Sequence, residues 1–153
     1  MIITFCGHSD YRGSKEDEEK ILFLLSKKVG DRPADLYLGG YGSFDAFALS
    51  CGKQYQKTHP HVKLLLITPY MTESYRKNRL PYDKKIYDEV VFPELDHVPP
   101  KFAISHRNKW MIEKADCVIA YVRYSWGGAY QTYQHAIRTH KETFNLAYST
   151  PAT

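Results

Sequence analysis

The sequence predicts an α/β protein with a Rossmann-like, doubly wound and mostly parallel sheet of five or six strands, with helices on both faces. Its strand-like segments are mostly continuous apolar runs, a pattern typical of parallel strands that are buried on both faces. Helical patterns lie between these runs, and alternating strands and helices lead to right-handed crossovers. A length of 153 residues fits a single domain, residues 1–153.

The expected elements follow one another along the chain. The strand-like runs are residues 2–6, 35–38, 62–68, 89–92, 117–122 and 143–147. A capping box, Ser14-x-x-Asp17, opens the first helix, whose apolar face ends at Gly30. Further helices are expected around residues 44–51, 105–115 and 130–139.

Two segments interrupt this alternation. Residues 70–88 are polar, basic and rich in tyrosine, and residues 95–102 contain Pro99-Pro100. Both are long for connections in an α/β domain, and long connections often act as functional lids. An ordinary surface excursion explains each segment equally well, so both interpretations stay open.

Composition and charge limit the classes of ligand, metal site and location that this protein is expected to have. A net charge of +4 is compatible with an anionic small ligand and is weak evidence for nucleic acid, which is possible but not favoured. Cys6, Cys51 and Cys117 are too far apart for a C-x-x-C pair, so we expect no disulfide, no zinc or other metal site, and no cofactor. Because no signal-peptide pattern or bilayer-length apolar run is present, we expect a cytoplasmic protein without a membrane partner.

Ligands of open α/β sheets bind beyond the carboxyl ends of the strands, and three loops of this sequence follow strand ends. The first contains Gly7, His8 and Arg12. Gly7 permits a tight exit from the strand, and the two basic side chains could meet an anion. The acidic start of the next helix makes a phosphate unlikely at that helix end, and a turn with a satisfied histidine is an equal alternative.

The second loop runs from a strand directly into a helix and contains Gly39, Gly40 and Gly42. Three glycines in four positions let backbone N–H groups approach a ligand. Ser43 could cap the helix or bind a phosphate oxygen, and Asp45 could accept a hydrogen bond from a ribose hydroxyl. Tight packing is the alternative explanation for these glycines.

The third loop contains Trp126, Gly127 and Gly128 and opens the last long helix. No acidic residue follows in the first turns, so the positive helix end is free for an anion. Thr132 adds a hydroxyl. Trp126 offers a face on which a base can stack, although core packing explains most isolated tryptophans.

Arg107 is expected to open the preceding helix, where a cation opposes the helix dipole. We therefore expect Arg107 and the Gly127-Gly128 turn to form one anion site at the same sheet edge. A solvated arginine is the alternative.

In order along the chain, Arg107-Asn108-x-x-Met111, Ala115-Asp116, the apolar run 117–122 and Gly127-Gly128 resemble the SLOG superfamily. That group includes the LOG phosphoribohydrolases, the DprA-type DNA-processing proteins and the YpsA-like bacterial proteins. The Gly7-His8 and Arg107-Asn108 pairs are most similar to the YpsA-like branch. The resemblance spans nearly the whole chain and implies a phosphate-binding site that includes Asn108, as well as a homodimer or higher homo-oligomer.

The catalytic glutamate of LOG enzymes has no counterpart here, since Tyr130-Gln131-Thr132-Tyr133-Gln134 contains no carboxylate. We therefore expect a protein that binds a nucleotide or nucleotide-derived ligand, as a sensor or sequestering protein. The first alternative is a nucleotide N-glycosidic hydrolase or transferase that takes a carboxylate from segment 70–88. The second is a DNA-associated, DprA-like module that uses the basic residues of that segment.

Overall fold

The computed structural model describes residues 1–95 and 97–148, and the remainder of the predicted domain 1–153 lies outside the described residues. The strands are β1 (Ile2–Gly7), β2 (Ala34–Leu38), β3 (Val62–Ile67), β4 (Glu89–Val91), β5 (Cys117–Tyr121) and β6 (Glu142–Asn145). They form one sheet in the order β4-β3-β2-β1-β5-β6. Every neighbouring pair is parallel. The predicted fold class is confirmed, with six strands.

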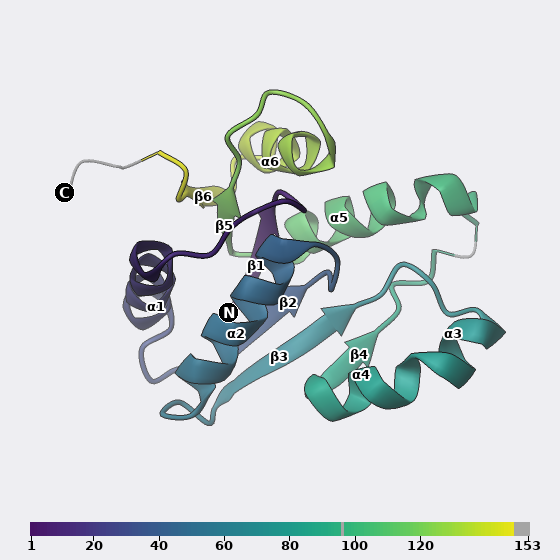
Figure 1. Cartoon of the computed structure of the whole chain (residues 1–153), viewed down its shortest axis with the longest axis horizontal. Helices are drawn as coiled ribbons and strands as arrows, with labels where there is room; N and C mark the ends of the chain where they lie inside the picture. The colour runs from purple at the N-terminus through teal and green to yellow at the C-terminus, as the bar shows by residue number, and fades with distance from the viewer. Residues whose placement is uncertain (96, 149–153) are drawn as a thin grey trace.

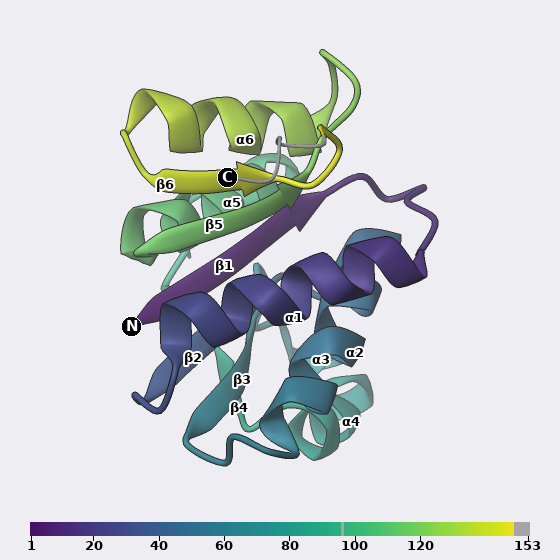
Figure 2. The same cartoon turned by 90° about the vertical axis from the view of Figure 1, so that its left-hand side faces the viewer.

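Helices cover both faces of the sheet, as Figures 1 and 2 show. They are α1 (Lys15–Val29), α2 (Ser43–Gln56), α3 (Glu73–Asn78), α4 (Leu80–Ile86), α5 (Ala103–Lys114) and α6 (Gly128–Arg138), with a 3-10 turn, η1 (Pro100–Phe102), before α5. The apolar sides of α1 and α2 form the larger core with one face of the sheet. On the other face, α5 and α6 pack with β5 through residues such as Ile112, Val118 and Ala136.

The first helix begins where the capping box predicts. Ser14 Oγ accepts a hydrogen bond of 3.1 Å from the Asp17 amide, and Gly30 ends the helix with a φ of 58°. The Tyr11 hydroxyl donates to Asp17 Oδ2 over 2.7 Å. The chain leaving β1 is therefore tied to the start of α1, which fixes the first loop at the edge of the sheet.

Segment 70–88 is not a plain connection, because it folds into α3 and α4. Thr72 Oγ1 caps α3 by accepting from the Tyr75 amide over 3.1 Å, and Pro81 lies in the first turn of α4. The Tyr75 hydroxyl donates to the buried carboxylate of Asp83 over 2.7 Å and joins the two helices. Helices of this length carry too few apolar residues to show a helical period in the sequence.

The sheet has a topological switch point between β1 and β5. From β1 the chain moves through β2 and β3 to β4 in one direction, whereas β5 pairs with the other side of β1 and leads to β6. The helices that follow β1 and β5 cover opposite faces, so the loops after these two strands diverge and leave a crevice between them. This crevice holds the site described next.

Candidate functional site

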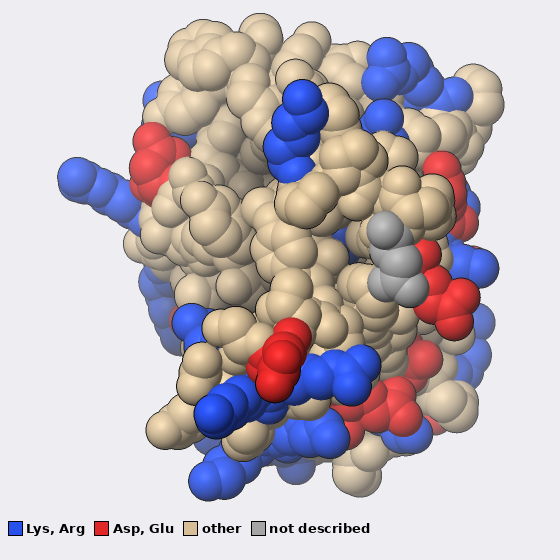
Figure 3. Space-filling view, turned by 90° about the vertical axis from the view of Figure 1, so that its right-hand side faces the viewer, with Lys and Arg blue, Asp and Glu red and all other residues tan. Residues whose placement is uncertain are grey.

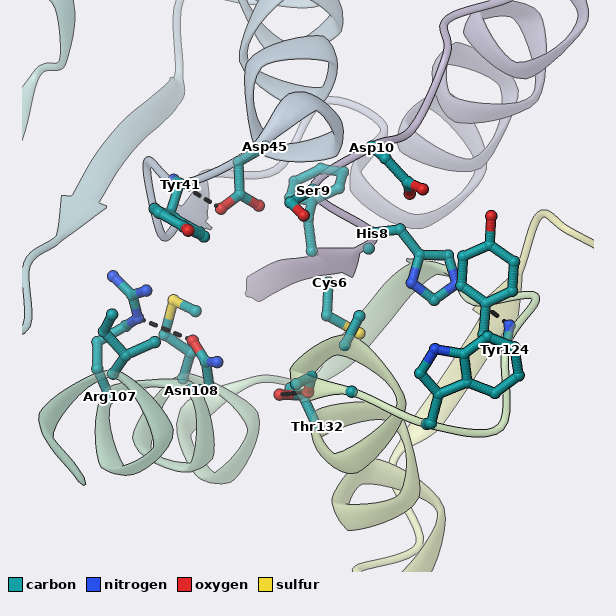
Figure 4. Close-up of a pocket in the computed structure, with 18 residues that line it drawn as sticks. Cys6, His8, Ser9, Asp10, Tyr41, Asp45, Arg107, Asn108, Tyr124 and Thr132 are labelled. Atoms are coloured by element: carbon teal, nitrogen blue, oxygen red, sulfur yellow. Dashed lines mark hydrogen bonds between the residues drawn. The ribbon is translucent and has the colours of Figure 1, made fainter. Parts of the chain in front are cut away.

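A cavity of about 380 Å³ lies at the switch point, and we call it the first cavity. It is formed by the loops after β1 and β5, the inner side of α5 and the start of α6 (Figure 4). The sequence-predicted residues that line it are Gly7, His8, Asp45, Arg107, Asn108, Trp126, Gly127, Gly128 and Thr132. All three predicted loops therefore contribute to this one cavity.

His8 connects the two strand-end loops. Its Nε2 atom accepts hydrogen bonds from the amides of Arg123, over 2.8 Å, and Tyr124, over 3.3 Å. Because backbone amides only donate, Nε2 carries no proton, and the neutral ring holds its proton on Nδ1. Burial lowers the pKa of His8, which favours the same neutral form. His8 thus matches the satisfied histidine, and it can offer Nδ1–H, but no positive charge, to a ligand.

The start of α6 is an unoccupied group of backbone donors. The helix has no side-chain cap and no acidic residue in its first turn. Within the described residues, the amides of Gly128, Ala129 and Tyr130 have no hydrogen-bond acceptor. Thr132 does not supply a free donor, because its hydroxyl donates to the Gly128 carbonyl over 2.9 Å. The N–H groups and the helix dipole therefore favour an anion at this end of the cavity.

Gly127 has the backbone conformation that this start requires. Its φ of 91° and ψ of 176° fall in a region that is essentially restricted to glycine. A Cβ added to Gly128, by contrast, meets no atom within 4 Å. Only the first of the two glycines is therefore needed for the fold, and the second leaves open space beside the free amides.

Two aromatic rings lie beside these amides. The rings of Tyr124 and Trp126 stack with centroids 4.9 Å apart and an interplanar angle of 14°. Trp126 remains 68% exposed, so it is not the core residue that an isolated tryptophan usually is. Tyr124 is half-buried and also lies against the His8 ring, with centroids 4.3 Å apart, so the exposed Trp126 ring offers the face for a nucleobase.

Arg107 lies inside α5, four residues after its start at Ala103, and not at the helix start as the sequence suggested. Its side chain is buried, with 2% of the residue exposed. Nη1 donates to the carbonyls of Gly39 and Ile67, each over 2.8 Å, and Nε donates to Asn108 Oδ1 over 2.8 Å. Arg107 therefore ties α5 to the carboxyl ends of β2 and β3.

A guanidinium group carries five N–H donors, and these three bonds use three of them. Among the described residues, the two N–H groups of Nη2 have no acceptor, and the side chain lines the cavity. Figure 4 shows the guanidinium directed towards Tyr41 and Asp45. Burial lowers the pKa of Arg107, but arginine stays protonated at neutral pH. Arg107 is both a structural residue and a source of two free charged donors.

Asp45 faces Arg107 across the cavity. Its Oδ2 atom accepts a hydrogen bond of 3.0 Å from the Tyr41 amide. Burial raises the pKa of Asp45 from its ordinary 3.8 to about 6, against the opposing effects of that bond and of Arg107. Asp45 therefore holds the Tyr41 loop in place, and its charge changes near pH 6.

The glycine-rich loop before α2 mainly packs against its neighbours. Gly42 has a φ of 88°, and a Cβ there would come within 2.8 Å of Ser9 Cα. The Ser43 amide donates to the Ser9 carbonyl over 3.1 Å, and the exposed Ser43 side chain does not cap the helix. The first amide of α2 is thus bonded to the first loop, whereas the first amide of α6 has no acceptor among the described residues.

A second cavity of about 300 Å³ adjoins the first. Gly39 and Gly40 line this cavity and not the first one, and Gly42, Ser43 and the exposed Arg12 line neither. The two cavities share the residues Tyr41, Ile104 and Arg107.

Sequence reasoning missed several residues that line the first cavity. They are Ser9, Asp10, Tyr41, Ile104, Met111 and Tyr124. Ser9, Asp10 and Tyr124 lie within the strand-end loops, so taking the loops whole would have included them. Met111 stands in the Arg107-Asn108-x-x-Met111 motif of the resemblance, whereas Ile104 carries no such signal, because its position depends on how α5 crosses the sheet.

The carboxylates of the first cavity are Asp10 and Asp45, which come from strand-end loops. The hydrolase hypothesis expected a carboxylate from segment 70–88. In that segment Glu73 is exposed and lines neither cavity, and Asp83 lines only the second cavity, where it accepts from Tyr75. No group of three His, Cys, Asp or Glu side chains within residues 1–95 and 97–148 is arranged to hold a metal ion.

The three cysteines are buried and unpaired with one another, as small core residues. None of the helices in the described part of the chain combines the length and apolarity that a bilayer crossing requires.

No family model and no curated protein matches the sequence. Solved structures do share its fold. The X-ray structure of DNA processing protein A (DprA) from Streptococcus pneumoniae aligns with a TM-score of 0.63 and 17% identity, over 94% of this chain and 49% of that one. DprA from Helicobacter pylori, described in a study of its single-stranded DNA binding mode, aligns with a TM-score of 0.60 and 15% identity. This alignment covers 95% of this chain and 64% of that protein.

The chain thus spans about half to two-thirds of the length of these DprA proteins. DprA-type proteins are one of the groups in the SLOG resemblance, whereas nothing in these structures distinguishes the YpsA-like branch, which stays a prediction. The chain has the α/β fold that DprA proteins have.

Proposed function

We propose that this chain binds single-stranded DNA and holds one nucleotide of the strand in the first cavity. The observation that carries the proposal is the juxtaposition, in one cavity, of the stacked Tyr124–Trp126 pair, the free amides at the start of α6 and the free Nη2 donors of Arg107. Aromatic faces stack with bases, and backbone amides and arginine bind phosphate.

Two further observations support DNA over a free nucleotide. The fold is shared with DprA of Helicobacter pylori, whose study concerns single-stranded DNA binding. Exposed cations also cluster on α3 and α4, beside the cavities, at the lower edge of the face in Figure 3. They are Arg76, Lys77, Arg79, Lys84 and Lys85, and none forms an ion pair with a described residue. Cations of this kind bind the backbone of a strand without reading its sequence.

The test is fluorescence anisotropy of a labelled oligothymidylate with the wild type and Gly128→Val. Because a Cβ at position 128 meets no atom within 4 Å, we expect the variant to fold and its methyl groups to hinder approach to the neighbouring free amides. We expect a loss of affinity of about tenfold or more, the equivalent of one charge-assisted hydrogen bond. Ser50→Val, at an exposed site of α2 outside both cavities, is the matched control. Equal affinities for all three proteins would overturn the proposal.

A free nucleotide is the second candidate, because 380 Å³ lies at the small end of the range for small-ligand sites. Calorimetric titration with nucleoside monophosphates separates the two. Tight binding of a mononucleotide that an oligonucleotide does not displace favours a sensor or sequestering protein. Release of free base in the same mixtures would identify the N-glycosidic enzyme.

A further inference from the structure

The two cavities are adjoining parts of one groove. Both are lined by Tyr41, Ile104 and Arg107, so these residues form the boundary between them. Tyr41 is 67% exposed and Ile104 is 37% exposed. The boundary is therefore open to solvent at Tyr41 and Ile104, and the buried Arg107 side chain lines both cavities.

The second cavity carries the same kinds of groups as the first. Tyr70, Tyr75 and Tyr87 line it and supply aromatic surface. The Tyr75 hydroxyl donates to Asp83 over 2.7 Å, and burial with this bond raises the pKa of Tyr75. Thr68 Oγ1 donates to the Tyr70 carbonyl over 2.9 Å, which holds the start of the segment. The Tyr75 ring is thus held through its hydroxyl, and Tyr70 is held through its backbone.

Arg79 supplies the charge of the second cavity. It lies between α3 and α4, lines the cavity and is exposed. No carboxylate of a described residue lies within 4.0 Å of it. Exposed cations lie on α3 and α4 on either side of it, and Lys and Arg side chains gather at the lower edge of Figure 3.

We infer that the second cavity is a second nucleotide subsite, so that the groove takes at least two consecutive nucleotides of a single strand. One base stacks at Tyr124 and Trp126, the next enters the tyrosine-lined cavity, the phosphate between them meets the free Nη2 of Arg107, and Arg79 meets the following phosphate. The sizes of the cavities and their shared boundary support a strand, because each cavity has the volume for one small unit. This inference rests on the proposed function.

The test compares ligand lengths. Affinities of 5′-phosphorylated thymidine mono-, di- and tetranucleotides are measured for the wild type, Arg79→Gln and Tyr70→Ala. We expect each variant to bind the tetranucleotide about tenfold more weakly and the mononucleotide within twofold of the wild type. Lys63→Gln removes one exposed positive charge on β3, outside both cavities, and is the matched control for Arg79→Gln. If Arg79 contacts a phosphate, its loss should reduce the steepness of the plot of log affinity against log salt concentration. For the tetranucleotide this reduction is about 0.7.

The outcomes separate the two proposals. If Gly128→Val weakens binding of the tetranucleotide but Arg79→Gln and Tyr70→Ala do not weaken it more than Lys63→Gln does, the second subsite is wrong and the first stands. If Gly128→Val has no effect, the proposed function itself fails.

Photo-crosslinking gives a second measurement that does not depend on variants or on mononucleotide affinity. A tetranucleotide with 5-iodouracil at successive positions is crosslinked to the wild type, and the products are mapped by mass spectrometry. We expect one position to crosslink at Tyr124 or Trp126 and a neighbouring position at Tyr70 or Tyr75. Crosslinks confined to Tyr124 and Trp126 from every position would overturn the second subsite.

Discussion

Arg107 combines two tasks at the residue scale. Its bonds to the Gly39 and Ile67 carbonyls hold α5 on the ends of two strands, and its remaining donors face the groove. Replacing Arg107 with alanine should therefore affect the fold as well as ligand binding. Removing the side chain also leaves two buried carbonyls without their donor.

We accordingly predict that Arg107→Ala lowers the free energy of unfolding by about 3 kcal/mol, through the loss of charge-assisted hydrogen bonds in a buried setting. Urea denaturation followed by circular dichroism measures this change. Lys109→Ala, at an exposed position of the same helix, is the control and should stay within about 0.5 kcal/mol of the wild type. A loss below about 1 kcal/mol for Arg107→Ala would show that the two carbonyls find other partners.

Asp45 makes stability depend on pH. Its pKa is raised to about 6 in the folded protein from an ordinary 3.8, so between these values the folded state binds more protons than the unfolded state. The contribution of Asp45 is therefore complete below about pH 4 and is lost as the pH rises through about 6.

We predict that Asp45→Asn is more stable than the wild type at pH 7, by an amount on the order of 2 kcal/mol. The amide oxygen can still accept from the Tyr41 amide, so the loop keeps its bond. Denaturation of both proteins at several pH values gives the difference, which should shrink as the pH falls from about 6 to about 4. A difference that is constant between pH 4 and pH 7 would mean that Asp45 titrates normally.

At the element scale, α2 and α6 have the same local design and different surroundings. Each begins after a glycine with positive φ, Gly42 or Gly127, and neither has a side-chain cap. The start of α2 receives the Ser9 carbonyl and is followed by Asp45, whereas the start of α6 has free amides and no acid. An anion is therefore more favourable at the first turn of α6, which has no bonded first amide and no opposing carboxylate, than at that of α2.

The two adjacent glycines of α6 should respond oppositely to alanine. Gly127→Ala forces a side chain into a glycine-only conformation and should lower the unfolding free energy by about 1–3 kcal/mol. Gly128→Ala meets open space in a helical position and should raise it by about 0.5 kcal/mol. Urea denaturation of the two variants provides the measurement. Equal destabilisation by both would contradict the assigned backbone conformations.

At the scale of the whole molecule, the strand order places the groove. The loops after β1 and β5 diverge because the two crossovers run to opposite faces, and the groove then extends along the carboxyl edge towards α3 and α4. The functional elements therefore lie on one edge of the sheet.

We keep the prediction, drawn from the SLOG resemblance, that the protein forms a homodimer or higher homo-oligomer. The chain exposes large side chains such as Phe23, at 65%, and Tyr82, at 66%, and burying apolar surface contributes about 25 cal/mol per Å². Sedimentation velocity at micromolar concentration should give at least twice the monomer mass. A monomer across the whole concentration range would contradict this prediction.

The sequence by itself determined the fold class and the main elements, but not the short helices α3 and α4. The apolar runs of the strands, the capping box at Ser14 and the stop at Gly30 are local signals, because burial on two faces and helix capping each involve residues that are close in the chain. The strand-end loops could be chosen for the same reason, since ligands of open α/β sheets bind at the carboxyl edge.

The tertiary structure alone decided which parts of those loops face a ligand. Gly42 and Gly127 have the same sequence context before a helix, but only Gly42 has the Ser9 backbone against it. In the sequence Arg107 is indistinguishable from a free cation. In the fold, β2 and β3 place the carbonyls of Gly39 and Ile67 within hydrogen-bond distance of it. These contacts join residues far apart in sequence, so they depend on strand order and helix crossing, for which a single chain carries no local signal.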